Sequence, residues 1–162
     1  MSGGTAIHIR QAEKADLQGI CLLSEEINRH HHQHAPDIFV AQTDHVREEA
    51  YWLALLQGAQ STIFVAESDD AVLGFVTASW SENTAVPFLN VKRICRIGTI
   101  VVTQAQRKQG IGHKLMDAAI QWGRQQNAHE VRLEVLDFNQ DAMRFYARMG
   151  FQVMSHILQR AS

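Results

Sequence analysis

The sequence predicts a mixed α/β fold whose central sheet is largely antiparallel and contains a parallel β-α-β crossover. Two strand-like runs at 62–66 and 72–78 indicate the antiparallel part, because an Asp-Asp pair separates them as in a hairpin. A change in the spacing of apolar residues, from strand-like to helical and back, indicates the crossover. The long strand-like run at 93–102 is followed by helical spacing and then by another strand-like run at 131–136. We expect antiparallel pairing before the crossover and parallel pairing across it.

The first half of the chain contains one more strand and two helices. Residues 6–10 alternate in part and are expected to form a strand. Asp16 and Asp44 each precede an apolar stripe with helical spacing, and each is expected to cap a helix. The stretches 28–38 and 80–90 are expected to be connecting loops.

The second half ends in a helix and a strand. The helix of the crossover has an apolar face made of Ile111, Leu115, Ala118, Ala119 and Trp122. A last helix is expected to end at Gly150, and its apolar face consists of Ala142, Phe145, Tyr146 and Met149. Residues 151–158 are expected to form a final strand.

Composition limits the classes of protein to which the chain can belong. The 162 residues fit one domain, expected over 1–162, and 46% hydrophobic with 20% charged residues is typical of a packed globular chain. The formal net charge of −2 argues against a nucleic-acid partner. No run approaches 18 apolar residues, and two scattered cysteines form neither a disulfide framework nor a zinc site. We therefore expect a cytoplasmic protein without a membrane partner or a metal.

A basic, glycine-rich stretch joins the long strand to the next helix and consists of Arg107, Lys108, Gln109, Gly110, Ile111 and Gly112. The first N–H groups of a helix lack acceptors within the helix, and the helix dipole makes that end positive. Glycines let such N–H groups approach an anion closely. The stretch is neither a Walker loop nor a G-x-G-x-x-G dinucleotide loop. On its own it fits either a diphosphate site or a plain glycine-rich helix entry with solvated basic side chains.

The Arg-x-x-Gly-x-Gly pattern at 107–112, between a strand and an amphipathic helix, resembles the acetyl-CoA site of the GNAT family of N-acetyltransferases. A second string at 139–151, Asn-x-x-Ala-x-x-Phe-Tyr-x-x-x-Gly-Phe, resembles the later helix of that family. Either string alone is moderately specific, whereas both in this order and at this spacing are strong. The resemblance is sharp over 95–152, and the first 90 residues match only in the order of their elements.

The resemblance implies a GNAT-like fold and acetyl-CoA as cofactor, with CoA as product. The strand end would pair its backbone with the pantetheine amides, which implicates Ile100, Val101 and Val102. The diphosphate would lie on the loop and the helix start, at Arg107, Lys108, Gln109, Gly110, Ile111, Gly112 and His113. Asn139 matches a residue that bonds the cofactor arm, and an asparagine there suits a helix cap equally well.

The reaction implied by the resemblance is direct attack of an amine on the acetyl carbonyl in a ternary complex. Tyr146 matches a tyrosine that protonates the leaving thiolate, while its alternative role is a packed aromatic beside Phe145. The backbone N–H of Val102 would stabilise the oxyanion. The acidic residue that many relatives carry on the central strand is absent from 96–100. The proton acceptor is therefore open between Glu134, Asp137, a histidine of 30–34 and water.

Four histidines gather at positions 30, 31, 32 and 34. His30 and His34 stand at a spacing that can hold a metal on a helix, but no local carboxylate or cysteine completes a ligand set, so no metal is predicted. In the family this region borders the acceptor cleft, and the resemblance implies His32 and Phe39 as cleft residues. Trp80, which follows the hairpin, is a further candidate for the acceptor side.

Three functions remain open on the sequence. The first is an acetyl-CoA-dependent N-acetyltransferase acting on a small-molecule amine or on a peptide or protein amine, with a homodimer compatible with the family. The second is a catalytically weak acyl-CoA-binding sensor or scaffold module, which the missing strand carboxylate supports. The third is a nucleotide-phosphate-binding domain of another fold, which leaves the string at 139–151 unexplained.

Overall fold

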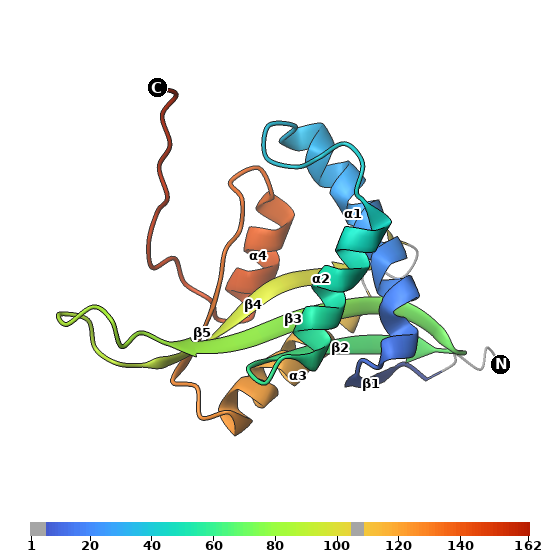
Figure 1. The fold of residues 1–162 in the computed structure, drawn as a ribbon, viewed down its shortest axis with the longest axis horizontal. Helices are drawn as coiled ribbons and strands as arrows, with labels where there is room; N and C mark the ends of the chain where they lie inside the picture. Colours follow the sequence, from blue (N-terminus) through green and yellow to red (C-terminus); the bar gives the residue numbers. More distant parts are fainter. Residues whose placement is uncertain (1–5, 105–108) are drawn as a thin grey trace.

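The computed structural model describes residues 6–104 and 109–162. Within them the chain forms β1 (His8–Gln11), the 3-10 turn η1 (Lys14–Asp16), α1 (Leu17–His34), α2 (His45–Gln57), β2 (Ser61–Ser68), β3 (Ala71–Glu82), β4 (Arg93–Val102), α3 (Ile111–Gln125), β5 (Glu130–Leu133) and α4 (Gln140–Arg148) (Figure 1). None of the helices in this described part combines the length and apolarity that crossing a membrane requires.

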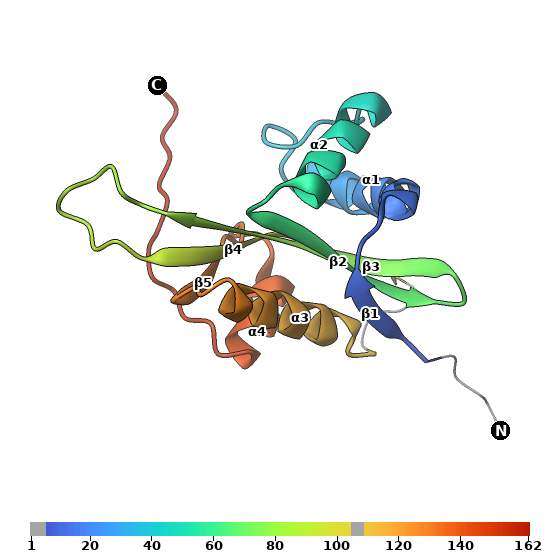
Figure 2. The same cartoon turned by 60° about the horizontal axis from the view of Figure 1, so that its bottom comes forward.

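The described strands form one sheet in the order β1-β2-β3-β4-β5. The first three pairings are antiparallel, whereas β4 and β5 are parallel and are joined by α3. Helices α1 and α2 cover one face of the sheet, and α3 and α4 lie on the other (Figure 2). The predicted fold class, a largely antiparallel sheet with one parallel crossover, is confirmed.

Two hydrophobic clusters lie on the two faces of the sheet. One joins α1 and α2 to the sheet and includes Trp52, whose ring meets Phe75 edge-on at 5.2 Å between centroids. The other joins α3 to the opposite face and includes Val76 and Trp122. Successive residues of β3 therefore point to opposite clusters, which explains why this strand reads as a continuous apolar run instead of an alternating one.

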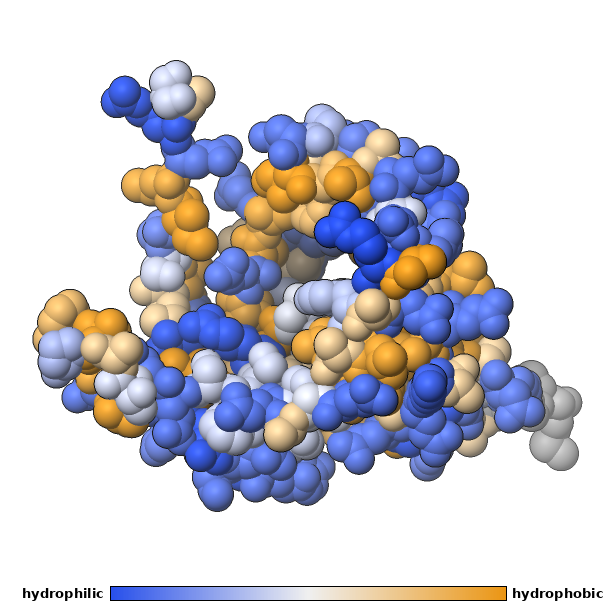
Figure 3. Space-filling view, viewed as in Figure 1, coloured by the Kyte–Doolittle hydropathy of each residue, from blue (hydrophilic) through white to orange (hydrophobic). Residues whose placement is uncertain are grey.

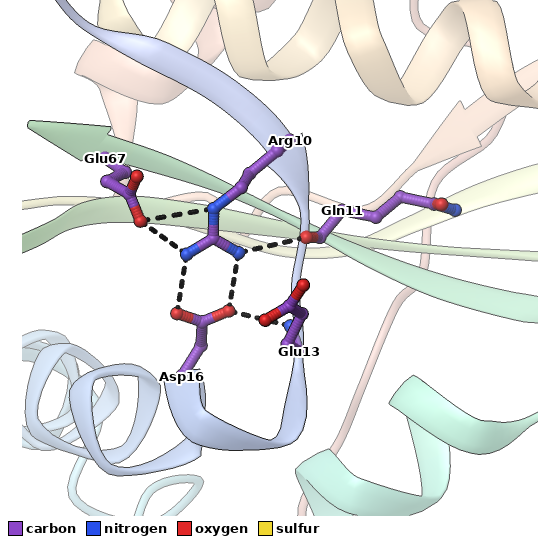
Figure 4. A network of polar contacts seen from close by, with 5 residues as sticks. All are labelled: Arg10, Gln11, Glu13, Asp16 and Glu67. Carbon is purple, nitrogen blue, oxygen red and sulfur yellow. Dashed lines mark hydrogen bonds and ion pairs between the residues drawn. The ribbon is translucent and has the colours of Figure 1, made fainter. Parts of the chain in front are cut away.

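The N-terminal strand is attached to the rest of the fold by a polar network (Figure 4). The Arg10 guanidinium donates to both carboxylate oxygens of Asp16, at 2.8 and 2.9 Å, and also to Glu67. Asp16 in turn accepts the backbone N–H of Glu13 at 2.7 Å. The network thus connects β1, the start of α1 and β2, and it holds the pKa of the Asp16 carboxyl below its ordinary value, mainly through the hydrogen bonds from Arg10.

Two expected loops are shorter than predicted. Helix α1 continues through the histidines to His34, because histidine is compatible with a helix and the chain is stopped only before Pro36. Strand β3 continues to Glu82, since residues through Glu82 pair with β4. The expected loops at 28–38 and 80–90 therefore give way to regular structure over part of their length.

The prediction of a final strand at 151–158 is wrong for the isolated chain. These residues have no regular secondary structure, and from Gln152 onward they are exposed. A strand needs a neighbouring strand to pair with, and β5 is shorter than expected, ending at Leu133.

Candidate functional site

A β-bulge interrupts the pairing of β3 and β4 near the middle of β4. Val76 pairs with Ile100 and Ala78 with Ile97, so Gly98 and Thr99 together face the single residue Thr77. The buried Thr77 hydroxyl oxygen accepts the backbone N–H of Thr99 at 3.0 Å. A Cβ on Gly98 would lie 2.8 Å from that oxygen, so a larger residue here would displace the hydroxyl that holds the bulge.

Beyond the bulge, one edge of β4 is left without a strand. Strand β5 pairs with β4 only from Ile94 to Ile97, whereas β4 runs on to Val102. The segment that contains Ile100, Val101 and Val102 therefore pairs with β3 on one side and has no strand partner among the described residues on the other. A free strand edge of this kind can pair with the amides of an extended ligand.

Helix α3 begins at Ile111, a few residues after the free edge of β4 ends at Val102. Gly110 precedes the helix with φ of +78°, a left-handed conformation that favours glycine. The first backbone bond of the helix is from Lys114 N–H to Gly110 carbonyl, so the N–H groups of Ile111, Gly112 and His113 belong to the open first turn. Gln109 and Gly110 are exposed, whereas Arg107 and Lys108, predicted to bind the diphosphate, lie outside the described residues.

Helix α4 brings the second sequence string against the first. A Cβ on Gly112 would lie 3.4 Å from the Phe145 ring and 3.8 Å from a methyl group of Val102. Tyr146 follows Phe145, and their rings meet edge-on at 5.3 Å between centroids. Burial raises the pKa of the Tyr146 phenol to about 12, so the phenol keeps its proton at neutral pH. The strand end, the helix start and Phe145 thus lie together, and Tyr146 is the next residue of α4.

Asn139 acts as a helix cap. Its side-chain oxygen accepts the backbone N–H of Ala142 at 3.2 Å at the start of α4. The cap is thus one of the two roles considered for this residue, and the amide nitrogen of its side chain is not used in that bond.

A surface hollow of about 770 Å³ lies between α3 and α4. It is lined by His113, Asp117, Ile120, Gln121, Arg124, Gln125, Arg148 and Met149. It reaches the first turn of α3 at His113. Two arginines in its lining make it compatible with an anionic ligand that extends from the helix start.

The carboxyl end of α1 meets the loop before α4. The rings of His34 and Phe138 are stacked at 5.1 Å, and His31 lies 6.0 Å from Phe138 and 4.7 Å from Phe39. His32 faces the backbone of Phe39, with 2.8 Å between its Nδ1 and the carbonyl oxygen. These rings, which we name the aromatic bridge (His31, His34, Phe39 and Phe138), join α1 and the segment after it to the loop before α4. The surface is hollowed between α4 and α2 (Figure 3).

Two other predicted residues make none of the ring contacts of the aromatic bridge. Trp80 packs on the α3 side of the sheet, and the Arg93 guanidinium carbon lies 3.7 Å from the centre of its ring. Glu134 is exposed just after the end of β5. The structure therefore brings His32 and Phe39 together, whereas Trp80 packs against the hydrophobic cluster under α3. In the part of the chain that the structure describes, no group of three or more His, Cys, Asp or Glu is arranged to hold a metal ion.

Sequence reasoning missed two parts of this site. The hydroxyl of Thr77 holds the bulge, and the available signal was Gly98, a glycine inside a predicted central strand. Phe138 joins the loop before α4 to α1, and no local pattern indicates that contact, because it links residues about one hundred positions apart.

A free strand edge followed by an open helix start is an arrangement suited to an extended, partly anionic ligand. The model of the acetyltransferase (GNAT) family matches residues 24–151. The chain therefore belongs to the GNAT acetyltransferase family, and it is an acyltransferase that uses acetyl-CoA. Both sequence strings lie inside or at the border of the matched region.

Curated relatives agree with this assignment, and solved structures share the fold. The chain is 27% identical over 146 residues to an uncharacterized N-acetyltransferase, YhfO, of Bacillus subtilis, covering 90% of each chain. It is 34% identical over 92 residues to N-acetyltransferase 8 of Homo sapiens, covering 57% of this chain and 39% of the human protein. A mutant protein from Bacillus halodurans has a similar fold, with a TM-score of 0.87, 22% identity and coverage of 96% and 99%. Aminoglycoside N-acetyltransferase AAC(6')-Iy, solved with CoA, also has a similar fold. Its TM-score is 0.81 and its sequence identity 18%, and the match covers 100% of this chain and 98% of that protein.

Proposed function

We propose that the chain, acting as one acetyltransferase domain, transfers an acetyl group from acetyl-CoA to a primary amine by direct attack within a ternary complex. The observation that supports this proposal best is the convergence of the free β4 edge, the start of α3 and Phe145 of α4 around Gly112, with Tyr146 next to Phe145 on the same helix. These are the groups needed for an amide arm, a diphosphate and a leaving thiolate.

The protein's own residues have separate tasks in this proposal. The backbone from Ile100 to Val102 aligns the cofactor arm, and the N–H groups at the start of α3, together with the loop before it, bind the diphosphate. Acetyl-CoA supplies the acetyl thioester. The N–H of Val102 stabilises negative charge on the carbonyl oxygen, and the Tyr146 hydroxyl donates its proton to the departing sulfur.

The acceptor amine binds on the side of the aromatic bridge. His32 and Phe39 shape this side, as the sequence predicted, and their contact at 2.8 Å supports a fixed arrangement. An ammonium has no lone pair, so the acceptor must lose a proton before it attacks. Glu134 is the proposed proton acceptor, and His31 is a second candidate. Burial and the nearby His30 and His34 lower the pKa of His31, which keeps its imidazole neutral and able to accept a proton at pH 7.

Small-molecule amines and peptide or protein amines are both compatible with the open acceptor side, and the aminoglycoside enzyme of similar fold is described as acting on the first kind. We also propose a cytoplasmic location, which the two free, buried cysteines support, because disulfides predominate in oxidising compartments.

Two measurements test the proposed function. Calorimetric titration with acetyl-CoA and with ATP tests the cofactor, and we expect saturable binding of acetyl-CoA only. A thiol-release assay with a panel of amines and peptides tests catalysis, and Glu134→Gln and His31→Gln in the same assay identify the proton acceptor. Binding of acetyl-CoA without release of thiol for any acceptor would favour the catalytically weak module. Binding of ATP alone would overturn the proposal.

A further inference from the structure

One face of the sheet is open at the end formed by β4 and β5. Figure 2 shows α1 and α2 over β2 and β3, with no helix on that side above β5. The burial pattern of β4 agrees, because Cys95 and Ile97 are buried while Arg96 between them is exposed. Strand β4 has a strand on either side at this point, so the exposure of Arg96 means that the described residues leave the face of the sheet uncovered there.

Two arginines lie next to each other on this open face. Arg96 of β4 pairs with Arg132 of β5, and Ser79 of β3 pairs with Arg96 on its other side. Both residues that flank Arg96 belong to the cluster under α3, so Arg96 points to the opposite face, on the side of α1 and α2. Both residues that flank Arg132 pack against the same cluster, which places Arg132 on that side too. We name Arg96 and Arg132 the arginine pair.

The positive charge of the arginine pair is only partly compensated. Glu130 accepts two hydrogen bonds from Arg132, at 3.1 and 3.2 Å, and lies 3.5 Å from the Lys92 ammonium. The hydrogen bond from Arg132 is the main reason why the pKa of the Glu130 carboxyl lies below its ordinary value. One carboxylate is thus shared by two cations, and no described residue forms a hydrogen bond or ion pair with Arg96. Arg96 is therefore available to an external anion.

The open face continues to the proposed acceptor side. Arg96 precedes Ile100 by four residues, about 13 Å along an extended strand, and the bulge at Gly98 lies between them. Beyond the bulge, Val101 belongs to the cluster under α1 and α2, so the side of the sheet that carries Arg96 is the side on which α1 and its aromatic bridge lie. An acceptor whose amine reaches the acetyl group can therefore extend along β4 toward Arg96.

We propose that the arginine pair selects acceptors that carry an anionic group, a carboxylate or a phosphate, several bonds away from the amine. This inference rests on the proposed acetyl transfer and names the chemical class of its acceptor. A guanidinium forms paired hydrogen bonds with a carboxylate or phosphate, and the Ser79 hydroxyl in the same row is a further donor. The same two cations repel a polyamine, so the site also discriminates against cationic acceptors.

Three amines that share one alkyl chain test this preference. They are n-pentylamine, δ-aminovalerate and cadaverine, which differ at the far end in a methyl, a carboxylate and an ammonium group. In the thiol-release assay we expect kcat/KM to be highest for δ-aminovalerate, by over about tenfold relative to n-pentylamine, and lowest for cadaverine. The peptide amides Ser-Glu-Ala, Ser-Gln-Ala and Ser-Lys-Ala repeat the comparison and distinguish a peptide acceptor from a small molecule. Added salt should weaken the preference, because Arg96 is exposed to solvent.

Substitutions identify the group that binds the anion. Arg96→Gln is expected to lower kcat/KM for δ-aminovalerate by about tenfold, to change that for n-pentylamine by less than about twofold, and to leave acetyl-CoA affinity unchanged. Arg96→Lys keeps the charge and should retain the order of the three amines. The matched control is Lys14→Gln, which removes the same charge from an exposed position next to β1, at the other edge of the sheet. This control should leave the kinetics of all three amines as in the parent protein.

Other results contradict the inference in distinct ways. Equal kcat/KM for the three amines, or a preference for cadaverine, overturns it and leaves the acetyl transfer intact. A preference for δ-aminovalerate that survives both Arg96→Gln and Arg132→Gln shows that another group binds the anion, which also overturns it. If no amine releases thiol, the proposed acetyl transfer fails, and calorimetric titration of the CoA-bound protein with the same amines tests the anion preference separately. Tighter binding of δ-aminovalerate that is lost in Arg96→Gln supports the preference, and equal affinities overturn it.

Discussion

Tyr146 is a buried tyrosine whose phenol proton is proposed to go to the leaving thiolate. Because burial raises its pKa to about 12, the hydroxyl keeps its proton at neutral pH. We expect Tyr146→Phe to lower kcat by about 10- to 100-fold, at the low end for a general acid, because a thiolate is a fair leaving group. Acetyl-CoA affinity should change by less than about twofold, since one hydroxyl is lost and the ring remains.

The control for this substitution is Tyr51→Phe. Tyr51 is the other tyrosine of the chain and is 58% exposed on α2, so its loss should leave kcat unchanged. Steady-state kinetics and calorimetry measure the two effects. A turnover rate of Tyr146→Phe equal to that of the parent would remove the hydroxyl from the reaction and leave Tyr146 as a packed aromatic.

At the scale of single elements, the outcome of each prediction depends on whether its signal is local. Strand β4 and helix α3 were predicted well because burial on one or two faces imposes a periodicity on 93–102 and on the residues from Ile111 to Trp122. The bulge in β4 and the free edge beyond it depend on how β4 aligns with its neighbours, and no local periodicity encodes that alignment. The prediction of a final strand at 151–158 was wrong for the same reason, because a strand forms only beside a partner strand.

The bulge leads to a prediction about β4, the strand proposed to align the cofactor arm. Thr77→Val keeps the shape of the buried side chain but leaves the Thr99 N–H without the oxygen that now lies 3.0 Å away. We expect the free energy of unfolding to fall by about 1–3 kcal/mol. Acetyl-CoA affinity should fall as well, because the bulge sets the course of β4 from Ile100 to Val102.

Thr77→Ser is the matched variant, because it retains the hydroxyl and loses one methyl group. Denaturant unfolding and calorimetric titration compare the two proteins. If Thr77→Val binds acetyl-CoA as tightly as Thr77→Ser does, the bulge does not control the cofactor edge.

At the scale of the whole molecule, the site is assembled from distant parts of the chain. For the residues of the two sequence strings, the family resemblance and the physics of a helix start agree, and their roles toward the cofactor stay predictions. The aromatic bridge between His34 and Phe138 could not, because only the packed sheet brings α1 next to the loop before α4. The acceptor side is thus less predictable from sequence than the cofactor side.

The Arg10 network makes the stability of the whole fold depend on pH (Figure 4). The hydrogen bonds from Arg10 lower the pKa of Asp16 in the folded protein below its ordinary value of 3.8. The contribution of the ionised carboxyl is therefore complete above that value and is lost as pH falls through the lowered pKa. Asp16→Asn removes this charge while keeping an oxygen for the Glu13 N–H. At neutral pH we expect it to lower the free energy of unfolding by about 1–3 kcal/mol, since Arg10 is partly solvated.

Chemical unfolding of the parent protein and Asp16→Asn between pH 2 and pH 8 measures this difference. The gap between the two free energies of unfolding should be constant above about pH 5 and should narrow as the solution is acidified below the ordinary pKa of an aspartate. Asp37→Asn, in the exposed segment after α1, should leave the free energy of unfolding within about 0.5 kcal/mol of the parent at every pH. A gap for Asp16→Asn that stays the same at low pH would mean that Asp16 stabilises the fold without its charge.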